Sequence, residues 1–116
     1  MGEYFKLANV TRREYIHPHR VDCGLKLPEW NYPDSPVWRR VAALKAAARW
    51  TDGDELRAVS DYGSVYRLTG APKTDTYDAH GNYDNTDLVS LPQGAAEDSP
   101  GSYDDISHNW LDVSDR

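Results

Sequence analysis

Residues 35–50 read SPVWRRVAALKAAARW, and this stretch decides the fold. Ser35 has the side chain of a helix N-cap, and Pro36 is favoured at the first helical position. The alanines add helix propensity. At about 100° per residue, apolar side chains recur on one side of such a helix: they are Val37, Val41, Leu44 and Ala48. The sequence therefore predicts an amphipathic helix over residues 36–50, ended by the Thr51-Asp52-Gly53 step.

A β-hairpin is predicted on the N-terminal side of this helix. Residues 3–9 are rich in strand formers and alternate, with Phe5 and Leu7 on one face and Lys6 on the other. The residues that follow are polar enough to turn, and residues 14–17 read as the returning strand. The apolar face of this hairpin is expected to pack on the helix.

A second hairpin is predicted on the C-terminal side. Residues 56–60 and 64–68 have strand composition and flank Asp61-Tyr62-Gly63, a turn that contains glycine. Two hairpins around one amphipathic helix indicate the α+β class. We expect a small antiparallel sheet, made of the two hairpins and covered on one face by the helix.

The charge of the chain divides at residue 70. Residues 1–70 carry 11 Lys and Arg against 9 Asp and Glu, whereas residues 71–116 carry 2 against 10. Low hydrophobicity combined with high net charge favours irregular structure over a second domain. We expect a hairpin–helix–hairpin core over residues 1–70. An acidic, aromatic-containing segment over residues 71–116 is expected to dock partly on that core.

Two local patterns stand out in the acidic segment. Residues 88–91, Leu-Val-Ser-Leu, predict a short strand. Ser107 is predicted to cap a terminal turn that carries Trp110 and Leu111. The rest of the segment has no hydrophobic period that would place a helix or a strand.

The composition argues against several classes of protein. The single cysteine, Cys23, cannot form an internal disulfide, which favours a reducing cytosol. No stretch has the roughly 18 consecutive apolar residues that a membrane-spanning helix needs. The formal net charge of −6 argues against direct nucleic-acid binding. We therefore expect a cytoplasmic protein with no membrane partner.

Three blocks of the sequence carry a resemblance. They are Tyr4-Phe5-Lys6-Leu7 with Asn9, Arg13-Glu14-Tyr15-Ile16-His17-Pro18-His19 and Gly24-Leu25-Lys26-Leu27; Trp50-x-x-Gly53-Asp54 with Ser60-Asp61-Tyr62; and Tyr103-Asp104-Asp105-Ile106-Ser107. Over these blocks the chain resembles a group of small uncharacterised proteins from bacteria, notably actinobacteria, and from their phages. The chain departs from the group after Leu27, where the group continues with a Gly- and Ser-rich stretch. The resemblance implies a protein of bacterial or phage origin in the host cytoplasm, and it carries over no catalytic residue.

The acidic segment is the first candidate for a binding surface. Carboxylates spaced among aromatic rings could occupy a basic groove and mimic a nucleic-acid backbone, which also presents repeated charge beside flat rings. The residues expected to bind are Tyr77, Asp78, Tyr83, Asp84, Asp87, Tyr103 and Trp110. We expect a non-enzymatic protein-interaction module, such as a phage or mobile-element accessory or inhibitor protein. Its expected partner is a protein with a basic surface.

A second reading centres on His17, His19 and Cys23, the densest set of soft ligands in the chain. Two histidines separated by one residue at a strand end can place both imidazoles on one side, and the cysteine could supply a third ligand for zinc. A fourth ligand would have to come from His80, His108 or an aspartate. This alternative is a metal-binding protein or a hydrolase.

A third reading is a structural subunit of a larger assembly. In this case Trp30, Trp38 or Trp110 would be exposed anchors for a neighbouring subunit, because tryptophan is enriched among residues that dominate interface energies. The sequence leaves the oligomeric state open.

Overall fold

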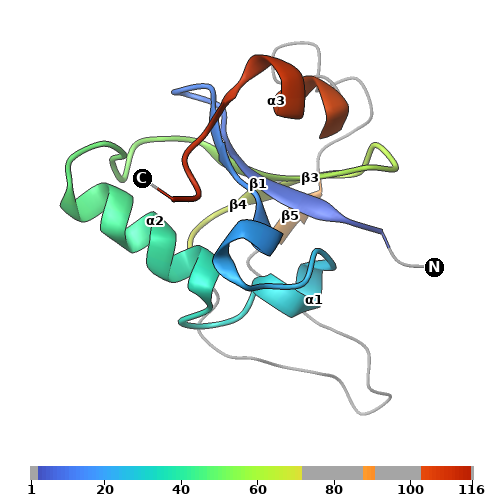
Figure 1. Ribbon diagram of the computed structural model, residues 1–116, viewed down its shortest axis with the longest axis horizontal. Coiled ribbons are helices and arrows are strands. Elements are labelled where there is room, and N and C mark those ends of the chain that lie inside the picture. The colour runs from blue at the N-terminus through green and yellow to red at the C-terminus, as the bar shows by residue number, and fades with distance from the viewer. Residues whose placement is uncertain (1–2, 72–87, 91–102, 116) are drawn as a thin grey trace.

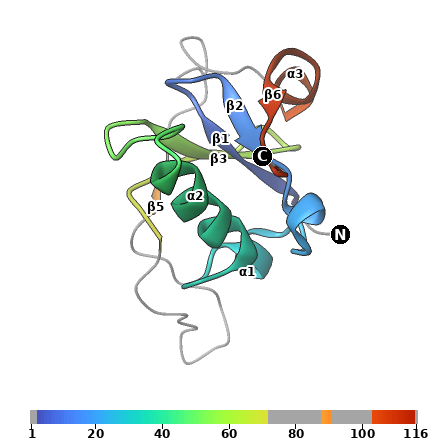
Figure 2. The ribbon, with the colours of Figure 1, turned by 60° about the vertical axis from the view of Figure 1, so that its left-hand side comes forward.

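The computed structural model describes residues 3–71, 88–90 and 103–115. The α+β class is confirmed (Figure 1). The described strands form a mixed sheet in the order β5-β4-β3-β1-β2-β6. Helices α2 and α3 lie on opposite sides of this sheet (Figure 2). Among the described residues, no helix has both the length and the apolar character needed to cross a membrane.

The strands of the front half form one continuous sheet. β1 (Phe5–Asn9) pairs antiparallel with β2 (Glu14–Ile16). β3 (Leu56–Ser60) pairs antiparallel with β4 (Val65–Leu68). The two strand pairs are joined because β1 also pairs antiparallel with β3, with Leu7 opposite Ala58. The antiparallel centre of the sheet therefore comes from the residues that the sequence assigns to the core.

The sheet extends beyond that expectation at both edges. β5 (Leu88–Ser90) pairs antiparallel with β4, as its composition predicts for a short strand. β6 (Leu111–Asp112) pairs with β2 in the parallel direction. A purely antiparallel sheet limited to the front half was therefore the wrong expectation, because residues from the end of the chain complete one edge.

Helix α2 (Pro36–Ala46) begins as predicted. The Ser35 hydroxyl accepts a hydrogen bond of 3.2 Å from the backbone N–H of Trp38, and Pro36 stands in the first turn. The helix ends four residues before the predicted end at residue 50. Ala48 adopts a left-handed conformation with φ of 59°, and the N–H groups of Ala48 and Arg49 return to Lys45 and Leu44. These two bonds form a Schellman C-cap in which alanine takes the place usual for glycine.

Two short helical turns connect β2 to α2. A 3₁₀ helix η1 (Pro18–Val21) follows β2 directly, and α1 (Leu27–Trp30) follows it along the chain. The backbone N–H of Phe5 donates a 2.8 Å hydrogen bond to the carbonyl of Leu25. This bond fixes the connecting segment beside the start of β1.

The back half contains a helix that the sequence analysis missed. Helix α3 (Tyr103–Asn109) places Ser107 in its last turn, so the expected terminal turn capped by Ser107 is wrong. The side chains of Ile106 and Val113 are fully buried. Residues 103–115 therefore contribute to the core, and residue 70 marks a change of charge rather than the end of the packed structure.

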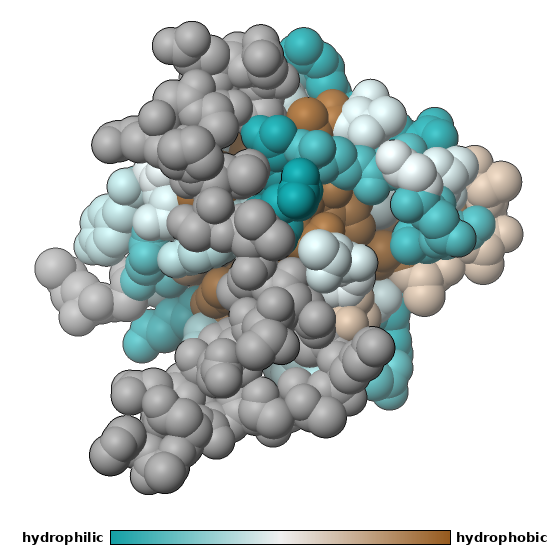
Figure 3. All heavy atoms as spheres, turned by 180° about the vertical axis from the view of Figure 1, so that it is seen from behind, coloured by the Kyte–Doolittle hydropathy of each residue, from teal (hydrophilic) through white to brown (hydrophobic). Residues whose placement is uncertain are grey.

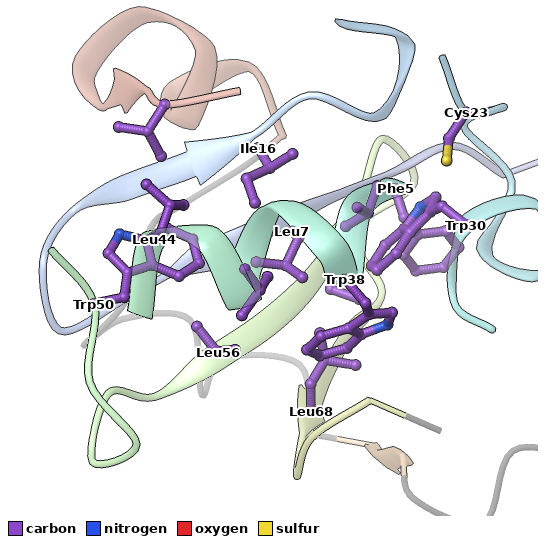
Figure 4. Packing of buried hydrophobic residues seen from close by; sticks show 14 of the residues in the cluster. Phe5, Leu7, Ile16, Cys23, Trp30, Trp38, Leu44, Trp50, Leu56 and Leu68 are labelled. Atoms are coloured by element: carbon purple, nitrogen blue, oxygen red, sulfur yellow. The ribbon is translucent and has the colours of Figure 1, made fainter. Parts of the chain in front are cut away.

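Alternation along the strands divides the core between the two faces of the sheet. On the α2 face, Phe5, Leu7 and Ile16 pack with tryptophans from the connecting segments (Figure 4). On the α3 face, a smaller cluster contains Ala8, Tyr15, Val59 and Ile106. Seen from behind, apolar surface of the described residues lies directly beside strongly hydrophilic surface (Figure 3).

Three of the four tryptophans, Trp30, Trp38 and Trp50, are buried in the core. Trp30 and Trp38 are 0% and 5% exposed. The expectation that they serve as exposed anchors for another subunit is therefore wrong. Both are held inside, and the Trp38 indole N–H donates a 2.8 Å hydrogen bond to the side-chain oxygen of Asn31. Trp110 is half-buried against the smaller cluster.

Candidate functional site

Two acidic stretches of the back half, residues 72–87 and 91–102, are flanked in the sequence by described strands and by helix α3. Residues 72–87 connect the residues that follow β4 to strand β5. Leu88 of β5 pairs with Leu68 of β4. Residues 91–102 run from β5 to α3, which contacts β1. Five of the predicted binding residues lie outside the described residues: Tyr77, Asp78, Tyr83, Asp84 and Asp87. The ends of both acidic segments are therefore attached to the folded frame.

Tyr103, a predicted binding residue, packs against a buried lysine. The Lys6 side chain leaves β1 on the α3 face and is only 3% exposed. Its ammonium group lies 3.7 Å from the centroid of the Tyr103 ring and 5.6 Å from that of Tyr15. It also donates to the hydroxyl of Ser107. Two aromatic faces and a hydroxyl oxygen thus replace part of the water that a buried ammonium group loses.

Trp110, the other described binding residue, lies beside the β1–β2 turn. The guanidinium carbon of Arg13 is 6.0 Å from the centroid of the Trp110 ring. The backbone N–H of Leu111 donates to the Arg13 carbonyl at 3.2 Å, which begins the pairing of β6 with β2. Leu111 itself is 40% exposed. Trp110 and Leu111 are therefore both partly exposed apolar residues, and an arginine lies beside the Trp110 ring.

Several carboxylates of the described residues form ion pairs with arginine or lysine side chains of the same chain. The ion pairs join Arg12 to Asp54, Arg20 to Asp112 and Asp115, Lys45 to Asp52, Arg49 to Glu14, and Arg57 to Glu55. Except for Arg20, these pairs lie within the front half, where the two signs nearly balance. The excess acidic charge of the chain is carried by residues beyond 70.

Asp54 is the most strongly held of these carboxylates. One of its oxygens accepts hydrogen bonds from the side chains of Asn9 and Arg12, at 2.9 and 2.7 Å, and from the backbone N–H of Thr51. Burial alone would raise the pKa of Asp54, but these hydrogen bonds outweigh it and lower the pKa to about 2. The carboxylate thereby ties the β1–β2 turn to the loop after α2.

Glu14 plays a similar part at the other end of the turn. Its two carboxylate oxygens accept from the Arg49 guanidinium at 3.2 and 2.6 Å, and one also accepts from the Trp50 indole N–H at 2.7 Å. The hydrogen bond to Glu14 holds Trp50 in the core, and Trp50 is not part of α2. Both polar clusters stabilise the frame, and neither was anticipated from the sequence because their partners lie more than 30 positions apart.

The proposed zinc ligands are placed in different surroundings. The ring centroids of His17 and His19 are 5.8 Å apart. Burial, with a smaller effect from Lys6, lowers the pKa of His17. Cys23 packs in the main core, where burial raises the pKa of its thiol. Over the described ranges, no three His, Cys, Asp or Glu side chains are arranged to hold a metal ion, and this covers His17, His19 and Cys23.

Comparison with known proteins does not assign the chain to a family. No protein-family model, curated protein or solved structure matches it. The resemblance of its N-terminal segment to small bacterial and phage proteins therefore remains a prediction. Any function has to be inferred from the geometry and the charge of the molecule itself.

Proposed function

We propose that this protein is a non-enzymatic interaction module that binds a basic surface on a protein partner. The proposed binding segments are residues 72–87 and 91–102, which follow β4 and β5 in the sequence. The observation that carries the proposal is the attachment of both segments at both ends, through β5 and α3. A segment fixed at two ends loses less conformational entropy on binding than a free tail of the same length.

The charge of these segments supplies the recognition chemistry. Residues 72–87 contain Asp75, Asp78, Asp84 and Asp87, and residues 91–102 contain Glu97 and Asp98. The carboxylates of the front half are largely balanced by its own cations, and these two segments carry a net charge of −5 out of the −8 of residues 71–116. Such an excess accelerates encounter with a basic partner and makes the affinity depend on salt.

The tyrosines add a contact that does not depend on charge. Tyr77 and Tyr83 lie one position before an aspartate, so each aromatic ring is accompanied by a carboxylate. This combination suits a basic groove that otherwise holds the phosphates and bases of a nucleic acid. The proposed role is therefore that of an accessory or inhibitor protein that blocks such a groove, as a phage or mobile-element protein would.

Two triple variants of equal charge test the proposal. The first replaces Asp78, Asp84 and Asp87 with asparagine. The matched control replaces Asp22, Asp34 and Asp52, which are exposed residues of the front half. Each variant changes the formal net charge from −6 to −3. The backbone at Asp22 and Asp34 has positive φ, which asparagine tolerates, so the control should fold.

The intact chain and both variants are immobilised and exposed to an extract of the organism from which the chain comes. We expect the intact chain and the control to retain the same basic protein, which salt releases. The first variant should retain much less of it. A nucleic acid added in excess should compete if the partner's groove is the target. Equal retention by the two variants would exclude residues 72–87 as the binding segment.

A further inference from the structure

The turn after α2 contains the one Asp-Gly step of the sequence, Asp52-Gly53, and the sequence has no Asn-Gly step. The side chain of Asp52 is 96% exposed. Its ion pair with Lys45 lies at the surface, where such pairs contribute little and do not fix a side chain. The Asp52 carboxyl group can therefore rotate towards the backbone that follows it.

Gly53 leaves its backbone nitrogen accessible. Within the described part of the chain, the Gly53 N–H has no hydrogen-bond acceptor. Gly53 is exposed, and a Cβ atom placed on it would meet nothing closer than the Thr51 hydroxyl oxygen, at 4.0 Å. Glycine also has the widest range of backbone angles, so residue 53 can turn its nitrogen towards the preceding side chain. A nucleophilic nitrogen and an exposed carboxyl group are thus adjacent.

We propose that Asp52 is a site of spontaneous isomerisation to isoaspartate. The Gly53 nitrogen attacks Cγ of the Asp52 carboxylic acid, the C–OH bond breaks, and the hydroxyl leaves as water with the proton of the nitrogen. A five-membered succinimide ring results. Water then adds to one ring carbonyl and breaks its bond to the nitrogen, which restores aspartate at Cγ or gives isoaspartate at the backbone carbonyl. Solvent water is the only co-reactant, and the reaction is independent of the proposed partner.

This isomerisation matters because a hydrogen-bonded turn spans the reacting residues. The Asp54 N–H donates to the Thr51 carbonyl at 3.1 Å, and the Asp54 carboxylate accepts from the Thr51 N–H at 3.0 Å and from its hydroxyl at 2.9 Å. Isoaspartate at position 52 lengthens the backbone between these two residues by one atom. We therefore expect at least one of the three bonds to be lost. Because Asp54 also holds Asn9 and Arg12, the β1–β2 turn should loosen.

Incubation of the intact chain in warm, neutral buffer made with H₂¹⁸O tests the proposal. Each passage through the succinimide introduces one solvent oxygen into residue 52, so the peptide that contains Asp52 and Gly53 should gain ¹⁸O with time. A protein isoaspartyl methyltransferase should transfer labelled methyl groups to the same peptide. Peptides whose aspartates precede bulkier residues, such as Asp61 before Tyr62, are the internal control and should gain little of either label.

Two variants separate this reaction from general ageing of the protein. Gly53→Ala should fold, because residue 53 does not have a positive φ and a Cβ atom has space there. The added Cβ atom shields the nitrogen and narrows the range of backbone angles, so both labels should appear several-fold more slowly. Asp52→Glu keeps the charge but would have to close a six-membered ring, so it should also take up label slowly.

Urea unfolding of the aged protein tests the consequence for the fold. The fraction that carries isoaspartate should unfold at a lower urea concentration than fresh protein, whereas aged Gly53→Ala should unfold as it did when fresh. The proposal is overturned if neither label enters the Asp52 peptide, or if Gly53→Ala takes up both labels as fast as the unaltered chain. An isoaspartyl fraction as stable as fresh protein would overturn the effect through Asp54.

Discussion

The ammonium group of Lys6 lies 3.7 Å from the centre of the Tyr103 ring, although 97 positions separate the two residues. This contact joins the first strand to the helix near the end of the chain. Lys6 is only 3% exposed, so its charge has left water and depends on Tyr103, Tyr15 and Ser107 for compensation. The position of α3, and with it one end of the acidic segment 91–102, therefore depends on a residue of β1.

Replacing Lys6 with methionine should destabilise the protein by about 1–3 kcal/mol, because the cation–π contacts and the hydrogen bond to Ser107 are lost. Methionine keeps most of the apolar stem, so the loss reports mainly on the ammonium group. Lys26→Met removes an exposed lysine and should change the free energy of unfolding by less than about 0.5 kcal/mol. Urea unfolding of the two variants measures the difference. Equal stabilities would show that Lys6 does not hold α3 in place.

Truncating Ile106 to alanine tests whether residues 103–115 belong to the core. Ile106 is fully buried, so Ile106→Ala should lower the free energy of unfolding by about 2–4 kcal/mol. Leu111→Ala, at a position 40% exposed, should cost less than about 1 kcal/mol. A C-terminal segment that is only loosely attached would instead give two small values. The same reasoning predicts that a chain cut at residue 70 cannot fold stably, since it loses both Ile106 and Val113.

The sequence predicted the elements that rest on local signals. Ser35 and Pro36 mark the start of α2 correctly, because capping depends only on neighbouring residues. The antiparallel pairs β1–β2 and β3–β4 occupy the segments whose composition favours strands. The end of α2 was placed too late, because Ala48 and Trp50 look helical locally. Their conformations are set by the C-cap and by the distant Glu14.

The candidate sites depend on contacts that sequence patterns do not encode. Lys6 alternates with Phe5 and Leu7, so it was placed on the opposite face, and nothing local indicates that α3 covers that face. Glu55 and Arg57, which form an ion pair, are only two positions apart in the sequence. In contrast, Arg57 and Arg67 face each other only because of the register between β3 and β4. Asp54 likewise gains its low pKa from residues of the first hairpin.

Glycine at position 48 should make the protein more stable. Ala48 is exposed and has a φ of 59°, a conformation in which a Cβ atom is strained. Ala48→Gly should therefore raise the free energy of unfolding by about 0.5–1 kcal/mol, even after the greater flexibility of the unfolded chain is included. Ala43→Gly, in the interior of α2, should lower it by about 1 kcal/mol. Thermal unfolding of both variants should show Tm shifts of opposite sign, and shifts of the same sign would contradict the C-cap assigned to α2.

Asp54 should make stability depend on pH in the acidic range. Its pKa of about 2 in the folded protein lies below the ordinary 3.8, so the folded state binds this proton less readily than the unfolded chain. Its contribution is therefore fully present above about pH 4 and is lost as the pH falls towards 2. Asp54→Asn should cost about 1–2 kcal/mol at pH 6, and this difference should shrink below pH 3. An unchanged difference between pH 6 and pH 2 would show that the carboxylate is not held by these hydrogen bonds.

The proposed function is tested most directly by the affinity of the captured basic partner for the two charge-matched triple variants, measured by titration at several salt concentrations. Replacing Asp78, Asp84 and Asp87 with asparagine should weaken binding at least about tenfold and flatten the salt dependence. Replacing Asp22, Asp34 and Asp52 should change the Kd less than about threefold, although the net charge is the same. Equal Kd values for the two variants would contradict binding through the acidic segment held between β4 and β5.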